Sequence, residues 1–79
     1  MYRTGTFIID DVSFKYEAKV FGTGSEFGID DGCISKLYVM KKTDDGSWIL
    51  VILYDRNWEI KPKTKLEKKA LNYILDIYK

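Results

Sequence analysis

The 79 residues of this chain suffice for one small domain, which at this length buries roughly 60–65% of the surface that the unfolded chain exposes. The only cysteine, Cys33, cannot form an intramolecular disulfide, so a disulfide-stapled secreted scaffold is excluded, and a net charge of +1 gives no overall electrostatic case for nucleic acid. The lack of histidine excludes Ser-His-Asp and Cys-His catalysis as well as metal ligation by imidazole.

The first two predicted strands are Thr4–Ile9 and Val12–Val20. In the second, apolar residues alternate with polar ones along its whole length. This period of two, with β-branched and aromatic side chains, is typical of a strand that has one wet face. We expect Asp10 and Asp11 to form the turn between the two strands, because aspartate side chains accept hydrogen bonds from nearby backbone N–H groups.

A loop is predicted next, over the glycine-rich segment Phe21–Gly32. The third strand is Ile34–Lys42, and Thr43–Ser47 reads as a hairpin turn in which Gly46 is free to adopt positive φ. The fourth strand is Trp48–Glu59. Its apolar residues fall on both faces, which predicts a central strand that is buried on each side.

The last predicted element is a helix. Pro62 ends the sheet, and Thr64 with Glu67 matches a capping box in which each side chain satisfies a backbone N–H donor. The order ββββα contains no βαβ unit. We therefore predict a single α+β domain over residues 1–79, with a four-stranded antiparallel sheet (about 4–60) packed by one C-terminal helix (about 64–78).

The recognisable motifs of catalysis are missing. The chain has no P-loop, no GxGxxG and no HExxH pattern, so we expect no catalytic set, no metal and no cofactor. The three pairs of consecutive aspartates are best explained as turns, and Cys33 as a small, partly buried apolar residue. The enzyme alternative would use Asp55 or Glu26 as a base beside Lys36 or Arg56.

The start of the third strand and the end of the fourth should share one edge of the sheet. With the hairpin turn centred on Asp45, Ser35 lies opposite Asp55 and Lys36 opposite Tyr54. Arginine and tryptophan are enriched at binding hot spots. The candidate binding residues that gather there are Glu26, Ser35, Lys36, Tyr54, Asp55, Arg56, Asn57 and Trp58. The structural alternative is that the charged residues pair with one another and that the tryptophan covers the end of the core.

A sequence pattern links this neighbourhood to a known group. Ser25–Ile29 (S-E-F-G-I), Gly32–Leu37 (G-C-I-S-K-L) and Tyr54–Trp58 (Y-D-R-N-W) resemble a pattern in small uncharacterised proteins of bacteriophages and Gram-positive mobile elements. Those proteins carry S-E-Y-G-I, G-R-I-S-K-L and Y-D-R-G-W in the same order. Cys33 stands where arginine is usual and Asn57 where glycine is usual. The resemblance implies an origin and no established activity.

Three kinds of function remain open. The leading hypothesis is a small binding protein, derived from a phage or mobile element, that inhibits a host or defence macromolecule by occupying it; a host protein such as a defence nuclease or a regulator is the expected target. The second is nucleic-acid binding by the lysine-rich start of the helix. Its phosphate contacts would be Lys61, Lys63, Lys65, Lys68 and Lys69. The third is the enzyme alternative above. If the Arg56 neighbourhood is structural, the alternative sites are the lysine-rich helix and the polar face of the second strand.

Location and assembly follow from the same features. The N-terminal residues form no charged-then-apolar leader, and the longest apolar run, Trp48–Tyr54, is far shorter than the ~20 residues of a membrane span. We expect a protein of the cytoplasm, in the host cell if it is phage-encoded, with no membrane contact. It should be a monomer or a homodimer formed through an exposed strand edge.

Overall fold

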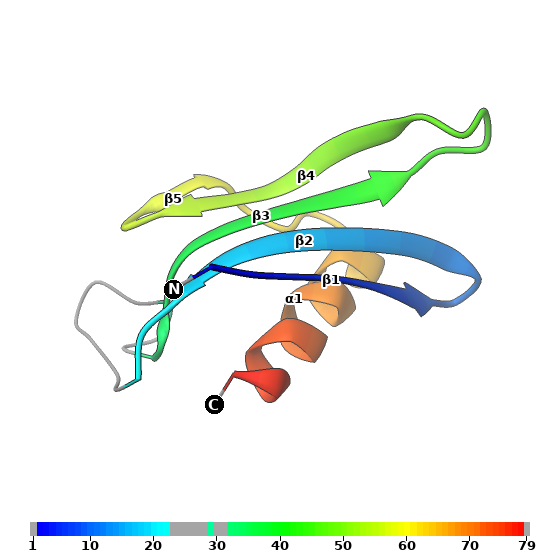
Figure 1. Cartoon of the computed structure of the whole chain (residues 1–79). Helices are drawn as coiled ribbons and strands as arrows, with labels where there is room; N and C mark the ends of the chain where they lie inside the picture. The colour runs from blue at the N-terminus through cyan, green and yellow to red at the C-terminus, as the bar shows by residue number, and fades with distance from the viewer. Residues whose placement is uncertain (1, 23–28, 30–31, 79) are drawn as a thin grey trace.

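A computed structural model describes residues 2–22, 29 and 32–78 and contains one antiparallel sheet with an α-helix packed against it (Figure 1). The strands lie in the sheet in the order in which they occur in the chain. The elements are β1 (Tyr2–Ile9), β2 (Val12–Val20), β3 (Ile34–Lys42), β4 (Trp48–Asp55), β5 (Trp58–Ile60) and α1 (Lys65–Ile77). The predicted α+β class, the antiparallel sheet and the C-terminal helix are confirmed.

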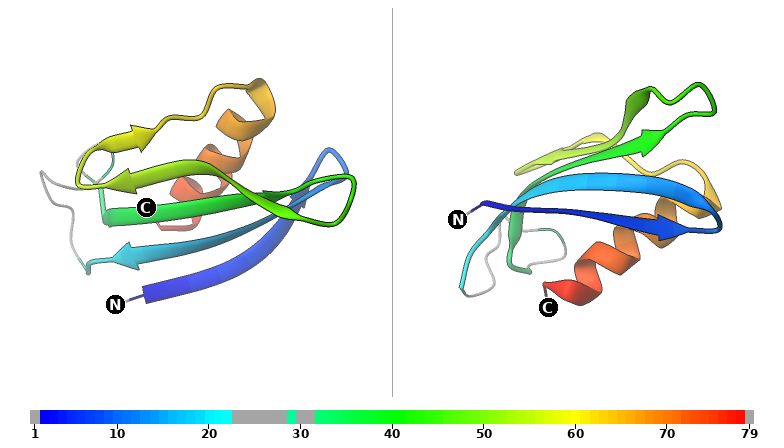
Figure 2. Two further views of the ribbon diagram at one scale, coloured as in Figure 1. Left: turned by 90° about the horizontal axis from the view of Figure 1, so that it is seen from above. Right: turned by 45° about the vertical axis from the view of Figure 1, so that its right-hand side comes forward.

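Helix α1 lies on one side of the sheet only, as both views in Figure 2 show. The core is the layer between the helix and the strands that face it. Its fully buried side chains come from β2, β3, β4 and α1: Phe14, Ala18, Ile34, Leu37, Val39, Ile52, Ala70 and Ile74. The alternation predicted for β2 is confirmed, because Phe14 and Ala18 are buried whereas Lys15 and Glu17 are not.

Gly5 on β1 gives an aromatic ring of β2 the space that it needs. Gly5 lies opposite Tyr16, and a Cβ atom at position 5 would lie only 2.7 Å from the Tyr16 ring. The ring reaches across to the end of α1, where the Tyr16 hydroxyl is 2.7 Å from that of Tyr78. Burial, followed by this hydrogen bond, raises the pKa of Tyr16 from 10.0 to about 12. The pair therefore ties the helix end to the sheet.

The predicted fourth strand, Trp48–Glu59, is wrong as a single strand. The chain reverses at Arg56, whose φ of 61° is a left-handed conformation. The Asp55 N–H group donates to the carbonyl of Asn57 at 3.0 Å, which closes the turn. The sheet consequently has five strands rather than four, and the residues after the turn form β5 beside β4.

The register between β3 and β4 changes partway along the strands. Met40 lies opposite Leu50, whereas Val39 lies opposite Ile52, so Val51 is an extra residue on β4. Such a bulge displaces every later pair by one position. The turn itself has the predicted form, because the Gly46 N–H group donates to the Thr43 carbonyl at 3.0 Å with Gly46 at φ 87°.

Because of the bulge, the predicted pairing at the candidate site is wrong by one residue. Lys36 lies opposite Asp55 and Leu37 opposite Tyr54, whereas we predicted Ser35 opposite Asp55 and Lys36 opposite Tyr54. The prediction assumed a regular ladder from the turn onward. A shift of one residue exchanges the faces, so the side chain beside the Asp55 carboxylate is the Lys36 amine rather than the Ser35 hydroxyl.

The expectation that β4 has a neighbouring strand on each side is confirmed, but the expectation that both of its faces are buried is wrong. The central strand is β3, and β4 lies between β3 and the short β5. Ile49 and Leu50 on β4 are 46% and 37% exposed. Leu50 lies opposite Met40, on the side that α1 does not cover, and therefore stays in contact with solvent. Ile49 lies opposite Lys41, on the helix side of the sheet, and is exposed there as well.

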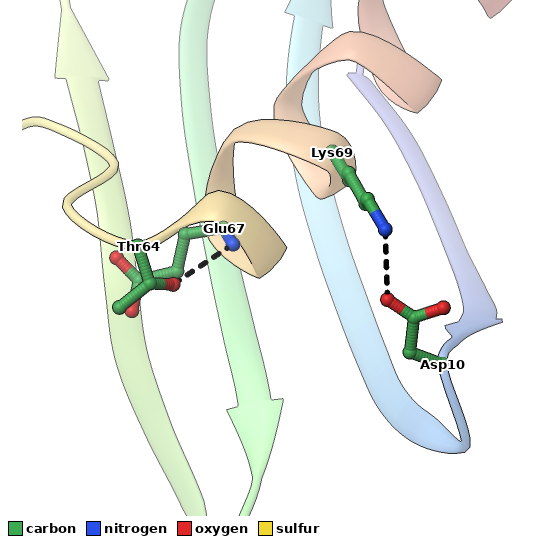
Figure 3. Close-up of polar contacts among 4 residues, drawn as sticks. All are labelled: Asp10, Thr64, Glu67 and Lys69. Carbon is green, nitrogen blue, oxygen red and sulfur yellow. Dashed lines mark hydrogen bonds and ion pairs between the residues drawn. The ribbon is translucent and has the colours of Figure 1, made fainter.

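Helix α1 begins at the predicted cap (Figure 3). The Glu67 N–H group donates to the Thr64 hydroxyl at 3.1 Å, and the Glu67 carboxylate accepts from the Lys63 N–H group at 2.8 Å, one residue before the cap. Lys69 forms an ion pair with Asp10 in the β1–β2 turn at 3.0 Å.

In the described part of the chain, no helix is long and apolar enough to cross a membrane.

Candidate functional site

The turn between β4 and β5 holds most of the sequence-predicted site. Arg56 lies exposed at the tip of the turn, and its backbone N–H group donates to the Ser35 carbonyl at 3.1 Å. The Asn57 side chain accepts from the N–H group of Trp58 at 2.9 Å, which stiffens the turn. The structure therefore brings residues 35–36 of β3 and residues 54–58 together, as predicted, through backbone contacts.

Three of the predicted site residues serve the fold. Ser35 and Tyr54 are buried, at 3% and 7% exposure. The Trp58 ring packs edge-on against the Tyr54 ring, with 4.9 Å between the ring centres, and covers the end of the core. This matches the structural alternative for the tryptophan, and it leaves Lys36, Asp55, Arg56 and Asn57 as the accessible part of the cluster.

The accessible charges at this end are partly paired. The Lys36 amine lies 3.8 Å from the Asp55 carboxylate, and both side chains retain about a third of their exposure, at 28% and 39%. An ion pair this exposed contributes little to stability. The predicted contact residue Glu26 lies outside the described residues, so the loop half of the predicted site has no described geometry.

A second surface lies on the sheet face opposite α1, which we call the open face. Residues that lie directly opposite each other on antiparallel strands share a face. The pairs Thr4–Glu17 and Thr6–Lys15 therefore lie on the side away from the core. This face contains a hollow of about 620 Å³ lined by Thr4, Gly5, Thr6, Lys15, Tyr16, Glu17, Tyr38, Met40 and Leu50.

The floor of this hollow is largely apolar and its surroundings are basic. Tyr38, Met40 and Leu50 belong to β3 and β4. The Lys15 amine lies 4.5 Å from the centre of the Trp48 ring, a cation–π contact at the end of the hollow. By the observed register, the charged side chains on the open face are Lys15, Lys19, Lys36 and Lys42 against Glu17 and Asp55.

The lysines at the start of α1 form a different surface. All five predicted phosphate contacts, at positions 61, 63, 65, 68 and 69, are exposed. Lys69 is engaged by Asp10. The Glu67 carboxylate lies among these lysines, where it accepts the Lys63 N–H group. The net positive potential of this surface is therefore lower than its lysine content indicates.

The described aspartate pairs have the structural role that we predicted. Asp10 and Asp11 form the β1–β2 turn, with φ of 52° and 65°. The Asp45 carboxylate accepts hydrogen bonds from the Thr43 hydroxyl and from the Ser47 N–H group, and these bonds hold its pKa below the ordinary value. Residues 30–31 lie outside the described ranges. Within those ranges, no cluster of three His, Cys, Asp or Glu residues can hold a metal ion.

Sequence reasoning missed the open face as a site, although it named the polar residues of β2. A signal for it was present. Tyr38 and Met40 alternate with the core residues Leu37 and Val39, so β3 carries apolar side chains on both faces. The 13 residues of a single helix cannot cover both faces of a five-stranded sheet. Apolar residues on the uncovered side must therefore meet solvent or a partner.

Comparison with known proteins gives one relationship. The model of one protein family, a domain of unknown function (DUF7678), matches residues 1–79. The searches of curated proteins and of solved structures each found no match. The family match spans both the open face and the β4–β5 turn, so both surfaces lie within the shared domain.

Proposed function

We propose that this chain, which belongs to the DUF7678 family, is a small binding protein of a bacteriophage or mobile element that acts by occupying a host protein. A defence protein or a regulator is the kind of target that we expect. The phage pattern in residues 25–29, 32–37 and 54–58 supports the origin. Binding, rather than catalysis, fits a chain that has no histidine and a single cysteine.

One observation carries the proposal: the open face holds an apolar-floored hollow that nothing in the described chain covers. Exposed apolar patches on small soluble domains mark interaction sites more often than isolated apolar residues do. Met40 is an adaptable contact residue because its side chain is unbranched and polarisable. Lysines around the apolar floor would favour a partner with acidic groups at the rim of its contact surface.

The test is capture of a partner by the immobilised chain from a bacterial lysate, with retained protein quantified against a Leu50→Glu variant. A carboxylate in the hollow should reduce retention at least tenfold, since disrupting a hot spot costs about 2 kcal/mol or more. Ile77→Glu is the matched control, because Ile77 is an exposed aliphatic residue on α1, at 48% against 37% for Leu50. The control should retain the partner at the wild-type level.

Two results would overturn this proposal. One is that no stoichiometric partner is retained by the wild-type chain. The other is equal retention by Leu50→Glu and wild type, with both folded by circular dichroism. Arg56→Asn then tests the β4–β5 turn, since asparagine tolerates the left-handed backbone at position 56 while removing the guanidinium.

Nucleic-acid binding is the second candidate function. It is supported by the exposure of all five lysines at the start of α1 and by the four lysines on the open face. Fluorescence anisotropy with labelled single- and double-stranded DNA and RNA at about 50 mM salt tests it, because contacts to phosphate are strongest at low salt. The absence of binding under these conditions would end this candidate.

A further inference from the structure

The two margins of the sheet differ in how well they are protected. β5 has three residues and pairs irregularly with β4. β1 has eight residues, and its ladder with β2 runs from Tyr2 to Ile9 without a bulge. In the left panel of Figure 2, β1 forms the outer margin of the sheet and no described element lies beyond it. A long regular edge presents unpaired N–H and C=O groups to other strands.

β1 also lacks the residues that usually block strand addition. Natural edge strands are protected by prolines, bulges, covering elements or several charges. β1 has no proline, and its only charged residue is Arg3. Its open-face side chains include Tyr2, 55% exposed, and Ile8, 69% exposed. These features favour an edge that is paired in the functional protein.

We propose that β1 pairs with β1 of a second copy, antiparallel, about a two-fold axis that passes beside Gly5 in each chain. A two-fold axis perpendicular to the sheet keeps each face continuous across the junction. Residues opposite each other must then share a face, so their numbers differ by an even amount. The register centred on Gly5 satisfies this condition and pairs seven residues of each strand.

The side chains fit this register. On the open face it places Tyr2 opposite Ile8 of the other copy, and Thr4 opposite Thr6. Aromatic with β-branched pairs and threonine pairs are both favourable across antiparallel strands. On the helix side the two Gly5 residues meet at the axis, where each lies beside the Tyr16 ring of its own chain. Each favourable pair occurs twice, as an isologous interface requires.

The dimer has a consequence for the open face. Since the axis is perpendicular to the sheet, the open faces of both copies lie on the same side of one continuous sheet. Thr4 and Thr6 line the hollow and also form the centre of the junction, so the hollows of the two copies become neighbours. The inference does not rest on the proposed function, because it depends only on the edge of β1.

Sedimentation equilibrium of the full chain between about 5 and 500 µM tests the pairing. We expect twice the chain mass of 9.2 kDa at the upper concentrations. Ile8→Lys should weaken association roughly tenfold, because it removes two favourable cross-strand pairs. Ile49→Lys is the matched control, since Ile49 is an exposed strand isoleucine on β4. A monomer at every concentration, or an unchanged Ile8→Lys dimer, would overturn the proposal.

A pair of substitutions tests the register. Tyr2→Lys and Ile8→Glu, each alone, should weaken association, and the double variant should recover it, because the introduced charges then face each other across the junction. Within one strand the two positions are roughly 20 Å apart, so the recovery cannot come from a contact inside one chain. A double variant that associates no better than either single variant would overturn the register. Circular dichroism confirms that each variant is folded.

Discussion

The two faces of this sheet are made by the same strands, but they have different tasks. On the helix side, Leu37 of β3 is fully buried against the core. On the open side, Leu50 of β4 is 37% exposed and lines the hollow. The stability of this chain therefore comes mainly from the helix side of the sheet. The other side is then free to vary with a partner at little cost to folding.

The same leucine-to-alanine substitution should lower the free energy of unfolding by very different amounts on the two faces. Leu37→Ala should lower the free energy of unfolding by about 2–5 kcal/mol, because it leaves a cavity in the core. Leu50→Ala should cost about 1 kcal/mol or less, because the side chain is already partly in water. Urea unfolding of both variants measures the difference. Equal losses would mean that both faces contribute equally to the fold.

The helix that seals the core gives the next effect. Thr64→Ala should cost about 1 kcal/mol, since the Glu67 N–H group loses its acceptor. Thr64→Ser keeps the hydroxyl and should remain close to wild type. Chemical denaturation distinguishes the two. If Thr64→Ser lost as much stability as Thr64→Ala, the methyl group of the threonine, and not its hydroxyl cap, would be responsible.

The aromatic pair at the other end of the helix makes stability depend on pH. The pKa of Tyr16 is about 12 in the folded chain and 10.0 in an exposed tyrosine, so the folded state holds its proton more tightly. This contribution is complete below pH 10 and is lost as the pH rises towards 12. Tyr16→Phe should therefore lose less stability than wild type between pH 10 and 12. Parallel slopes for the two proteins would contradict the raised pKa of Tyr16.

The smallest effect is expected at the ion pair that joins the helix to the β1–β2 turn. Lys69 and Asp10 are both well exposed, at 59% and 62%. Lys69→Met should change the free energy of unfolding by about 0.5 kcal/mol or less, because exposed ion pairs are weak. Thermal melts at low and high salt measure it. A loss of 2 kcal/mol or more would mean that this contact, rather than the core, holds the helix on the sheet.

Local signals in the sequence were sufficient for most of the fold. The alternation in β2, the Thr64 cap and the turn at Gly46 each have a mechanism within a few residues, and each was found where predicted. The bulge at Val51 has no such signal, since nothing in its neighbours requires an extra residue. The break at Arg56 was equally hidden, because arginine rarely adopts positive φ.

The candidate site was predicted in part. The prediction that residues 35–36 and 54–58 lie together is correct, because a hairpin fixes which strand ends meet. It could not tell that Ser35 and Tyr54 would be buried, since burial depends on the bulge and on the side that the helix covers. It also predicted that both faces of the fourth strand would be buried. The open face became visible only with the position of α1.

The central claim, that one face folds the chain and the other binds, is tested most directly by methyl NMR. Methyl signals of the isotopically labelled chain are followed while the partner captured from lysate is added. We predict large shifts for Met40 and Leu50 on the open face, and little change for Leu37, Ile52 and Ile74 in the core. Shifts confined to the core residues, or to residues beside the β4–β5 turn, would contradict this account.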